Sequence, residues 1–132
     1  ASGNLVWVES FGGSNNDNGS SIFVDDYGDI LITGEFSGTV DFDPGSTSYD
    51  ITSNGSDGVF IQKLASDGSF IWAEAMGGNA LELSQTVYKA NHIYTIGNFS
   101  GALNFDPCGN NTNLTSNSTS DIFSQRIWPA LR

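Results

Sequence analysis

The chain contains an internal repeat, and this feature constrains its fold more than any other. Residues 34–44 and 97–107 share seven of 11 amino acids at an offset of 63 positions. The match extends toward the N-terminus, where Trp7 corresponds to Trp72 at an offset of 65. A fixed long period of this kind indicates a propeller, a solenoid or another array of stacked units.

Each unit is built from short strands, and no segment indicates a helix. In the first unit, residues typical of strands fill four segments bounded by Gly, Asp, Asn or Ser, namely 21–25, 29–36, 58–64 and 70–76. Tyr27-Gly28 and Asp67-Gly68 lie between neighbouring segments, so we expect hairpin turns there. A weaker pair of strands, 39–42 and 49–52, indicates a small inserted hairpin.

Continuous apolar runs such as Ile22-Phe23-Val24 fit sheets that are covered on both faces. A propeller blade between two neighbouring blades is such a sheet. We therefore predict an all-β fold of propeller-type blades with four antiparallel strands each, in two repeats of about 63–65 residues.

The unit boundaries follow from the alignment of the repeats. Residues 1–8 align with the final strand of a unit, so we expect this lead-in strand to complete a preceding or neighbouring blade. The first blade repeat then spans residues 9–76, and the second spans residues 77–132 and lacks its fourth strand. Two blades cannot close a ring, so we expect the assembly strand with Leu5 and Trp7 to reach another chain or a longer parent protein.

Charge excludes some classes of partner. The chain has 15 Asp and Glu against four Lys and Arg, a net charge of −11. Residues 1–72 carry −10 with Lys63 as their only base, and residues 73–132 carry −1. Four scattered cations cannot neutralise a phosphate backbone or an anionic membrane, and no apolar run approaches the ~18–20 residues of a membrane span. We expect neither nucleic acid nor membrane insertion.

The repeat residues carry a resemblance to a known family. GDILITGEFSGTVDFDPG at residues 28–45 and SDGVFIQKLASDGSFIW at residues 56–72 resemble the bacterial seven-bladed β-propeller (SBBP) repeat. The resemblance covers nearly the whole chain as two tandem repeats and implies an extracellular or cell-surface β-propeller. It implies no single activity, because the repeat is a scaffold that hosts different functions.

Clustered acids offer one weak metal site. Asp25, Asp26 and Asp29 surround a turn, and carboxylates in such a cluster can bind Ca²⁺. Asp also ends strands and caps turns, and the cluster becomes Lys-Ala-Asn-His at residues 89–92 of the second unit. We expect no cofactor, with calcium as the weaker alternative.

Catalytic candidates are weak as well. A glycosidase-type pair of acids could come from Glu35, Asp41 and Asp43, but the first two are Asn in the second unit. His92, the only histidine, lies in a turn that enters a strand. We therefore expect no catalytic residues and no enzymatic activity.

Asparagine and cysteine define candidate modification sites. Cys108 is the only cysteine, so it is either a free thiol or an interchain disulfide partner. Six positions fit the N-glycosylation pattern: Asn18, Asn54, Asn98, Asn110, Asn113 and Asn117.

The repeated aromatic residues have structural and functional interpretations. Phe36, Phe42, Phe99 and Phe105 recur with equal spacing and are expected in the core. Trp7 and Trp72 share one repeat position, which favours packing between blades or a sugar-stacking platform. Trp128 falls outside the repeat pattern and fits an exposed anchor or a capping contact.

The function that these patterns favour is non-enzymatic. We expect a secreted or cell-surface structural or adhesive module that self-assembles through blade-to-blade contacts into a ring or an extracellular filament. Its partners are copies of itself or adjacent blades of a longer parent. The alternatives are a carbohydrate-binding, lectin-like oligomeric propeller with glycan ligands, or a fragment of a larger surface protein.

Overall fold

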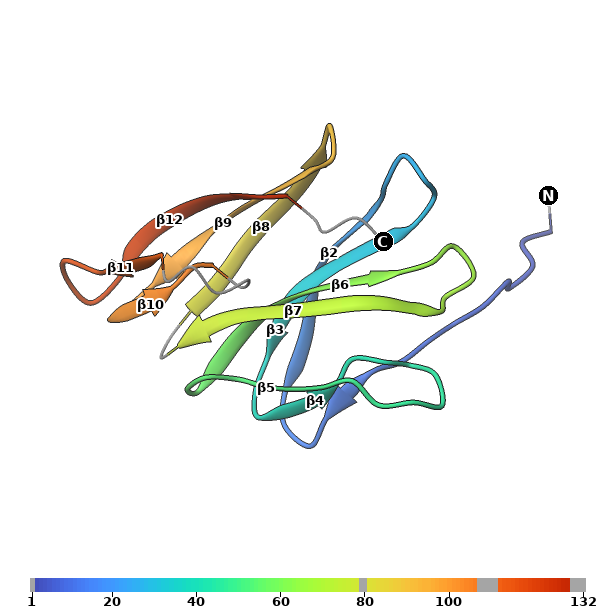
Figure 1. Ribbon diagram of the computed structural model, residues 1–132, viewed down its shortest axis with the longest axis horizontal. Coiled ribbons are helices and arrows are strands. Elements are labelled where there is room, and N and C mark those ends of the chain that lie inside the picture. Colours follow the sequence, from blue (N-terminus) through green and yellow to red (C-terminus); the bar gives the residue numbers. More distant parts are fainter. Residues whose placement is uncertain (1, 79–80, 107–111, 129–132) are drawn as a thin grey trace.

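The described part of the chain consists of β-strands and the turns that join them. The computed structural model describes residues 2–78, 81–106 and 112–128, and these form 12 strands in three antiparallel sheets with no helix. The all-β class predicted from the repeat is therefore confirmed. Figure 1 shows the arrangement of the strands, with colours that follow the chain from the N-terminus to the C-terminus.

The first repeat unit contains four adjacent antiparallel strands. They pair in the order β2, β3, β6, β7 and span Asp17–Val24, Ile30–Phe36, Asp57–Leu64 and Phe70–Gly78. The predicted turns close the β2–β3 and β6–β7 hairpins. Gly28 and Gly68 take φ angles of 85° and 89° in these turns, which glycine adopts without the strain that a Cβ would cause.

The second repeat unit contains three paired strands among the described residues. β8 (Leu81–Lys89), β9 (His92–Phe99) and β12 (Asp121–Ile127) pair in the order β12, β9, β8. Gln85 lies opposite Ile96 as Ser21 lies opposite Thr33, so β8 and β9 repeat β2 and β3. β12 repeats β6, and within the described residues it pairs along its β9 edge only.

Each unit also carries a small hairpin that pairs with the strand before the unit. These strands are β1 (Gly12–Gly13), β4 (Thr39–Asp41), β5 (Asp50–Thr52), β10 (Ala102–Asn104) and β11 (Asn113–Thr115). Gly12 in β1 lies opposite Asp41, and Gly77 in β7 lies opposite Asn104. Because these two pairs occupy equal repeat positions, residues 2–13 take the place in front of the first unit that β7 takes in front of the second. We call residues 2–13, which extend the predicted lead-in strand through β1, the lead-in segment.

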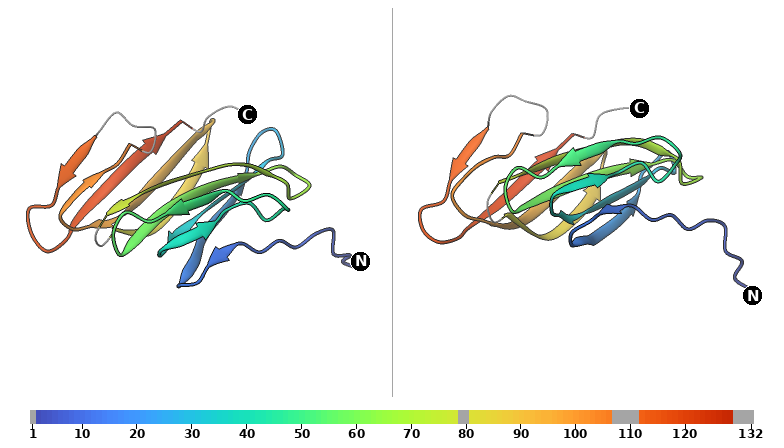
Figure 2. Two further views of the ribbon diagram at one scale, coloured as in Figure 1. Left: turned by 60° about the horizontal axis from the view of Figure 1, so that its bottom comes forward. Right: turned by 90° about the horizontal axis from the view of Figure 1, so that it is seen from below.

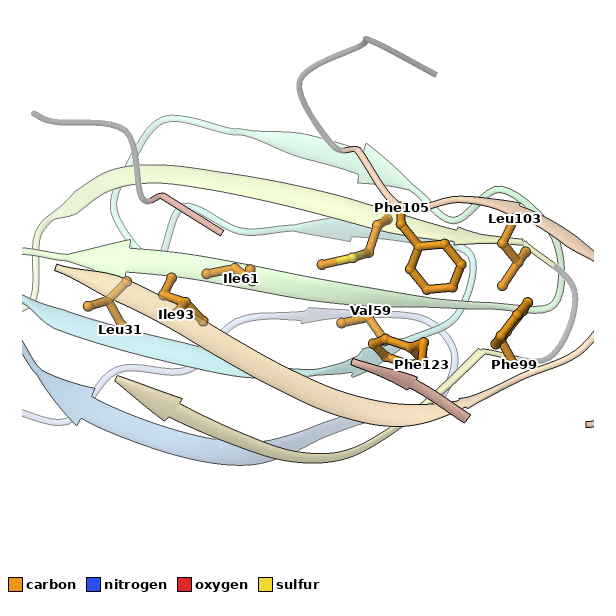
Figure 3. Packing of buried hydrophobic residues seen from close by; sticks show 9 residues of the cluster. Leu31, Val59, Ile61, Ile93, Phe99, Leu103, Phe105 and Phe123 are labelled. Carbon is orange, nitrogen blue, oxygen red and sulfur yellow. The ribbon is translucent and has the colours of Figure 1, made fainter. Parts of the chain in front are cut away.

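The two units stack face to face (Figure 2). Thr33 Oγ1 donates a buried hydrogen bond of 3.1 Å to Thr86 Oγ1 across this contact. Nine buried side chains fill the space between the units (Figure 3): Leu31, Val59, Ile61, Met76, Ile93, Phe99, Leu103, Phe105 and Phe123. The stacking gives each sheet the apolar partner that it needs.

A second hydrophobic cluster covers the other face of the first unit. It consists of Phe36, Val40, Phe42, Phe60 and Ala73. Phe11 of the lead-in segment packs against it, with its ring centroid 5.8 Å from that of Phe42 and 5.7 Å from that of Phe60. Phe11 corresponds to Met76, which packs in the same way between the two units.

The repeated phenylalanines are core residues, as the sequence predicts. Phe36 and Phe42 are 1% and 0% exposed, and Phe99 and Phe105 are 4% and 5% exposed. The rings of each pair meet edge to face, with centroids 5.3 Å apart for Phe36–Phe42 and 5.1 Å apart for Phe99–Phe105. The units therefore repeat their packing as well as their sequence.

Candidate functional site

The acidic turn of the first unit is organised around one lysine. Lys63 Nζ lies 2.8 Å from Asp25 Oδ2 and 3.1 Å from Asp29 Oδ2, and all three side chains are buried. Asp26 is exposed in the same turn. Two of the three calcium candidates therefore share a cation that the chain itself supplies. Within the described residues, no group of three or more His, Cys, Asp or Glu side chains is arranged to hold a metal ion.

Burial and hydrogen bonding act in opposite directions on these groups. Burial opposes the charged form of Asp25, but hydrogen bonds from Lys63 and from the N–H groups of Asp29 and Tyr27 hold the pKa of this carboxyl below its usual value. Burial likewise opposes the charge on Lys63, but Asp25 and Asp29 hold the pKa of the ammonium above its usual value. Asp25 and Lys63 therefore both stay charged inside the protein.

Lys63, in β6, is the partner of this acidic turn that the sequence interpretation missed. The signal was present, because Lys63 is the only base in residues 1–72. Arg126 takes its place in the second unit, where Lys89 and His92 take the places of the two buried acids. The buried ion cluster is consequently a feature of the first unit and not of the repeat.

Tyr88 links the acidic turn to the second unit. Burial raises the pKa of its hydroxyl, and the negative charges of Asp25 and Asp26 raise it further. The hydroxyl donates a hydrogen bond of 2.8 Å to Asn91 Oδ1. The turn proposed as a calcium site thus belongs to the contact between the two units.

Asp41 and Asp43 shape the loop that follows β4. Asp41 Oδ1 accepts hydrogen bonds from the N–H groups of Tyr49 at 2.9 Å and Asp43 at 3.0 Å, and these bonds lower the pKa of Asp41. Asn104 Oδ1 accepts a bond of 3.1 Å from the Asp106 N–H at the equivalent place. An amide oxygen accepts this hydrogen bond as a carboxylate oxygen does. The exchange of Asp41 for Asn104 between the units therefore fits a role in loop geometry.

The remaining catalytic candidates lie in separate settings. Glu35 is half-buried in β3, between Asn18 and Val59 of the neighbouring strands. His92 begins β9, and its ring lies edge-on to Trp128 with centroids 4.6 Å apart.

The glycosylation candidates differ in exposure. Asn98 is half-buried within β9, and Asn117 Nδ2 donates a hydrogen bond of 2.9 Å to Asp121 Oδ2. Cys108 and Asn110 lie outside the described residues. The exposed candidates are Asn18, Asn54, Asn113 and Asn117.

The candidate assembly strand lies beside the first unit without forming a ladder over residues 2–11. Trp7 Nε1 donates a hydrogen bond of 3.1 Å to the Ser66 carbonyl oxygen in the β6–β7 turn. Leu5 and Val8 are 79% and 74% exposed. Figure 1 shows this segment running away from the sheets toward the N-terminus.

The second unit presents an open face, which we define by Val87, Tyr94, Ile96 and Ile122. These side chains are 50%, 42%, 45% and 75% exposed. A cavity of about 440 Å³ lies on this face, lined by residues that include Val87, Tyr94 and Arg126. The equivalent face of the first unit is the one that the second unit covers.

A second cavity, which we call the edge cleft, follows β12. It has a volume of about 400 Å³ and is lined by residues that include Phe105, Leu114, Phe123, Gln125 and Trp128. Phe105, Leu114 and Phe123 correspond to Phe42, Ile51 and Phe60 of the first unit. There these residues pack in one cluster with Phe70 and Ala73 of β7. The edge cleft therefore marks the place that β7 fills in the first unit.

Comparison of the chain with protein-family models, curated proteins and solved structures gives no match in any of the three. Among the described residues, the chain has no helix of the length and apolar character that crossing a membrane requires.

Proposed function

We propose that the chain is a structural or adhesive module of an extracellular or cell-surface assembly, in which the repeat units act as propeller-type blades that pack face to face. The resemblance to the SBBP repeat supports the extracellular setting and the blade geometry. The face-to-face stacking of the second unit on the first is the model for the contact between copies. In this proposal the chain works by association and not by catalysis.

The observation that carries the proposal is the open face of the second unit. Three of its residues, Val87, Tyr94 and Ile122, correspond to Phe23, Leu31 and Val59. Leu31 and Val59 are 1% and 0% exposed because the second unit covers them. Apolar residues at the same positions of the second unit are open, and a contiguous apolar surface of this kind is typical of an interaction site.

One residue pair favours a second copy of the chain as the occupant of this face. Thr33 and Thr86 form the hydrogen bond between the units. Their repeat equivalents are Ile96 on the open face and Ile22 on the opposite face of the first unit. Ile22 is 66% exposed and Ile96 is 45% exposed. Stacking one copy on the next as the units stack within a chain brings these two isoleucines together.

Such stacking is head to tail, so it continues into a closed ring or an open filament according to the rotation between copies. The first unit carries nearly all of the negative charge, and the second unit is nearly neutral. A head-to-tail contact places an acidic unit against a nearly neutral one and keeps two acidic units apart.

The test is the oligomeric state of the chain and of an open-face variant. We expect the chain to form oligomers at micromolar concentration in size-exclusion chromatography with light scattering. Ile96→Asp should remain folded and become monomeric, since the side chain is exposed and a buried unpaired carboxylate opposes association. The control is Asn54→Asp, an exposed loop residue of the first unit that carries the same added charge. A monomeric unmodified chain, or equal association of both variants, contradicts the proposal.

The edge cleft favours a second candidate function, a lectin-like site. Trp128 is 63% exposed and lines the cleft together with Asp106 and Arg126. An exposed indole beside polar side chains suits stacking of a sugar ring. Binding on a glycan array that Trp128→Ala abolishes would support this function, and an array without signal would remove it.

A further inference from the structure

One edge of β12 is unpaired among the described residues, whereas the equivalent edge of β6 is paired in the first unit. β6 pairs with β3 on one side and with β7 on the other. β12 repeats β6 and pairs with β9. Its other edge borders the edge cleft, so both the backbone ladder and the side-chain packing of a fourth strand are absent there among the described residues.

The lead-in segment has the sequence of that fourth strand. At the offset of 65, Leu5 corresponds to Phe70, Trp7 to Trp72 and Phe11 to Met76. Phe70 packs in the second hydrophobic cluster, and its ring centroid lies 5.0 Å from that of Tyr49. Leu5 has no such partner in the described chain and is 79% exposed.

Within the described part of the chain, β1 of the lead-in segment is also paired along one edge only. Gly77 of β7 lies between Asn104 of β10 and Gly58 of β6. Gly12, at the equivalent position, lies opposite Asp41 of β4. The edge of the segment that faces β4 is therefore paired. The opposite edge, which in β7 pairs with β6, is open among the described residues.

We propose that residues 5–11 of one copy form an antiparallel fourth strand on β12 of a second copy. The β6–β7 ladder defines the register, because Val59 lies opposite Met76, Ile61 opposite Glu74 and Lys63 opposite Trp72. Applied to the donated strand, it places Phe11 opposite Ile122, Glu9 opposite Ser124 and Trp7 opposite Arg126. Leu5 and Val8 then enter the edge cleft, beside Phe105 and Phe123.

The donor and the acceptor belong to different copies. Figures 1 and 2 place the lead-in segment and β12 at opposite ends of the molecule. Strand addition to a sheet edge satisfies backbone hydrogen bonds and gives specificity through alternate side chains. This inference rests on the proposed blade-to-blade assembly and specifies which strands of two copies pair with each other.

Disulfide trapping tests the register. In a Cys108→Ser background, Glu9→Cys and Ser124→Cys are introduced in separate chains, which are mixed and oxidised with copper phenanthroline. Directly opposite residues lie within the Cα separation of 4.4–6.8 Å that a disulfide requires. We expect a covalent heterodimer from this pair and at least a tenfold lower yield from Val8→Cys with Ser124→Cys, because Val8 points to the other face.

Deletion of residues 2–8 provides the second measurement. We expect the shortened chain to keep its far-ultraviolet circular dichroism spectrum and to lose oligomers in light scattering. Oligomers that form without the Glu9–Ser124 cross-link, or that survive the deletion, overturn strand donation and leave the blade-face assembly intact. A full-length chain that stays monomeric overturns both proposals.

Discussion

At the scale of single residues, Lys63 is the cation that pairs with both carboxylates of the buried cluster in the first unit. Asp29 is 0% exposed and Asp25 is 7% exposed, so neither is solvated by bulk water. Removing one partner from a buried ionic cluster leaves uncompensated charge and is far more costly than the net strength of the intact cluster. Lys63 is therefore the polar residue whose replacement matters most for the stability of the acidic turn.

We expect Lys63→Met to lower the free energy of unfolding by about 3–5 kcal/mol, because the methionine keeps the volume and removes the charge. Urea denaturation at neutral pH measures this change. Lys89→Met is the matched control, since Lys89 is exposed and such surface substitutions change stability by no more than about 0.5 kcal/mol. Equal effects of the two substitutions would show that the cluster contributes nothing to stability.

The same cluster predicts the dependence of stability on pH. The folded pKa of Asp25 is lowered, so its contribution is complete above the unfolded value of about 3.9 and is lost as pH falls through the folded pKa. The folded pKa of Lys63 is raised, so its contribution is complete below about 10.4 and is lost as pH rises through the folded pKa.

Urea denaturation across pH 2–11 should therefore show a plateau with losses at both ends, and Lys63→Met should flatten the alkaline loss. If the stability of the unmodified chain falls at neither the acidic nor the alkaline end of this range, the pKa shifts assigned to Asp25 and Lys63 are wrong.

At the scale of elements, the sequence predicts strands well because their limits are set locally. Apolar segments bounded by turn residues predict strands at 29–36 and 58–64, close to β3 (Ile30–Phe36) and β6 (Asp57–Leu64). Turn chemistry located the Gly28 and Gly68 hairpins, where the backbone needs a positive φ. The repeat then transferred these assignments to β9 and β12.

Pairing between distant elements could not be predicted in the same way. The contact of the β4–β5 hairpin with β1, and of β10–β11 with β7, depends on how the units stack and not on local composition. The ion cluster of Lys63 likewise depends on residues more than 30 positions apart meeting at one turn. Tertiary packing decides these contacts, whereas local patterns report only the strands that take part.

The small hairpin is held to its sheet by one aromatic residue. Phe42 follows β4, is 0% exposed, and contacts the rings of Phe11, Phe36 and Phe60. Its carbonyl oxygen also accepts a hydrogen bond of 2.6 Å from Gln62 Nε2. The equivalent bond joins Gln125 to Phe105 in the second unit. In both units, the hairpin is thus fixed by a buried phenylalanine and by a glutamine bond to the carbonyl oxygen of that phenylalanine.

We expect Phe42→Ala to lower the free energy of unfolding by about 3–5 kcal/mol, since truncating a buried phenylalanine leaves a cavity among its neighbours. Thermal denaturation by circular dichroism at fixed concentration measures the loss. Phe105→Ala should behave similarly because it holds the equivalent position. Unchanged stability of Phe42→Ala would contradict the core assignment.

At the scale of the whole molecule, two features of the chain oppose each other in the assembly that we propose. The open face and the edge cleft offer apolar surface that association removes from water, at roughly 25 cal/mol per Å². Each copy also carries a net charge of −11, so the approach of a second copy meets long-range repulsion. The apolar contact is short-ranged and little affected by salt, whereas the repulsion extends over a Debye length.

Salt should therefore strengthen assembly. Raising sodium chloride from 0.01 M to 0.15 M shortens the Debye length from about 30 Å to about 8 Å, which screens the repulsion and leaves the apolar contact in place. We expect the association constant from sedimentation equilibrium to rise severalfold over this range, and Ile96→Asp to remain monomeric at both concentrations. An association constant that falls with salt would mean that charge pairs hold the copies together, and would assign the contact to a surface other than the open face.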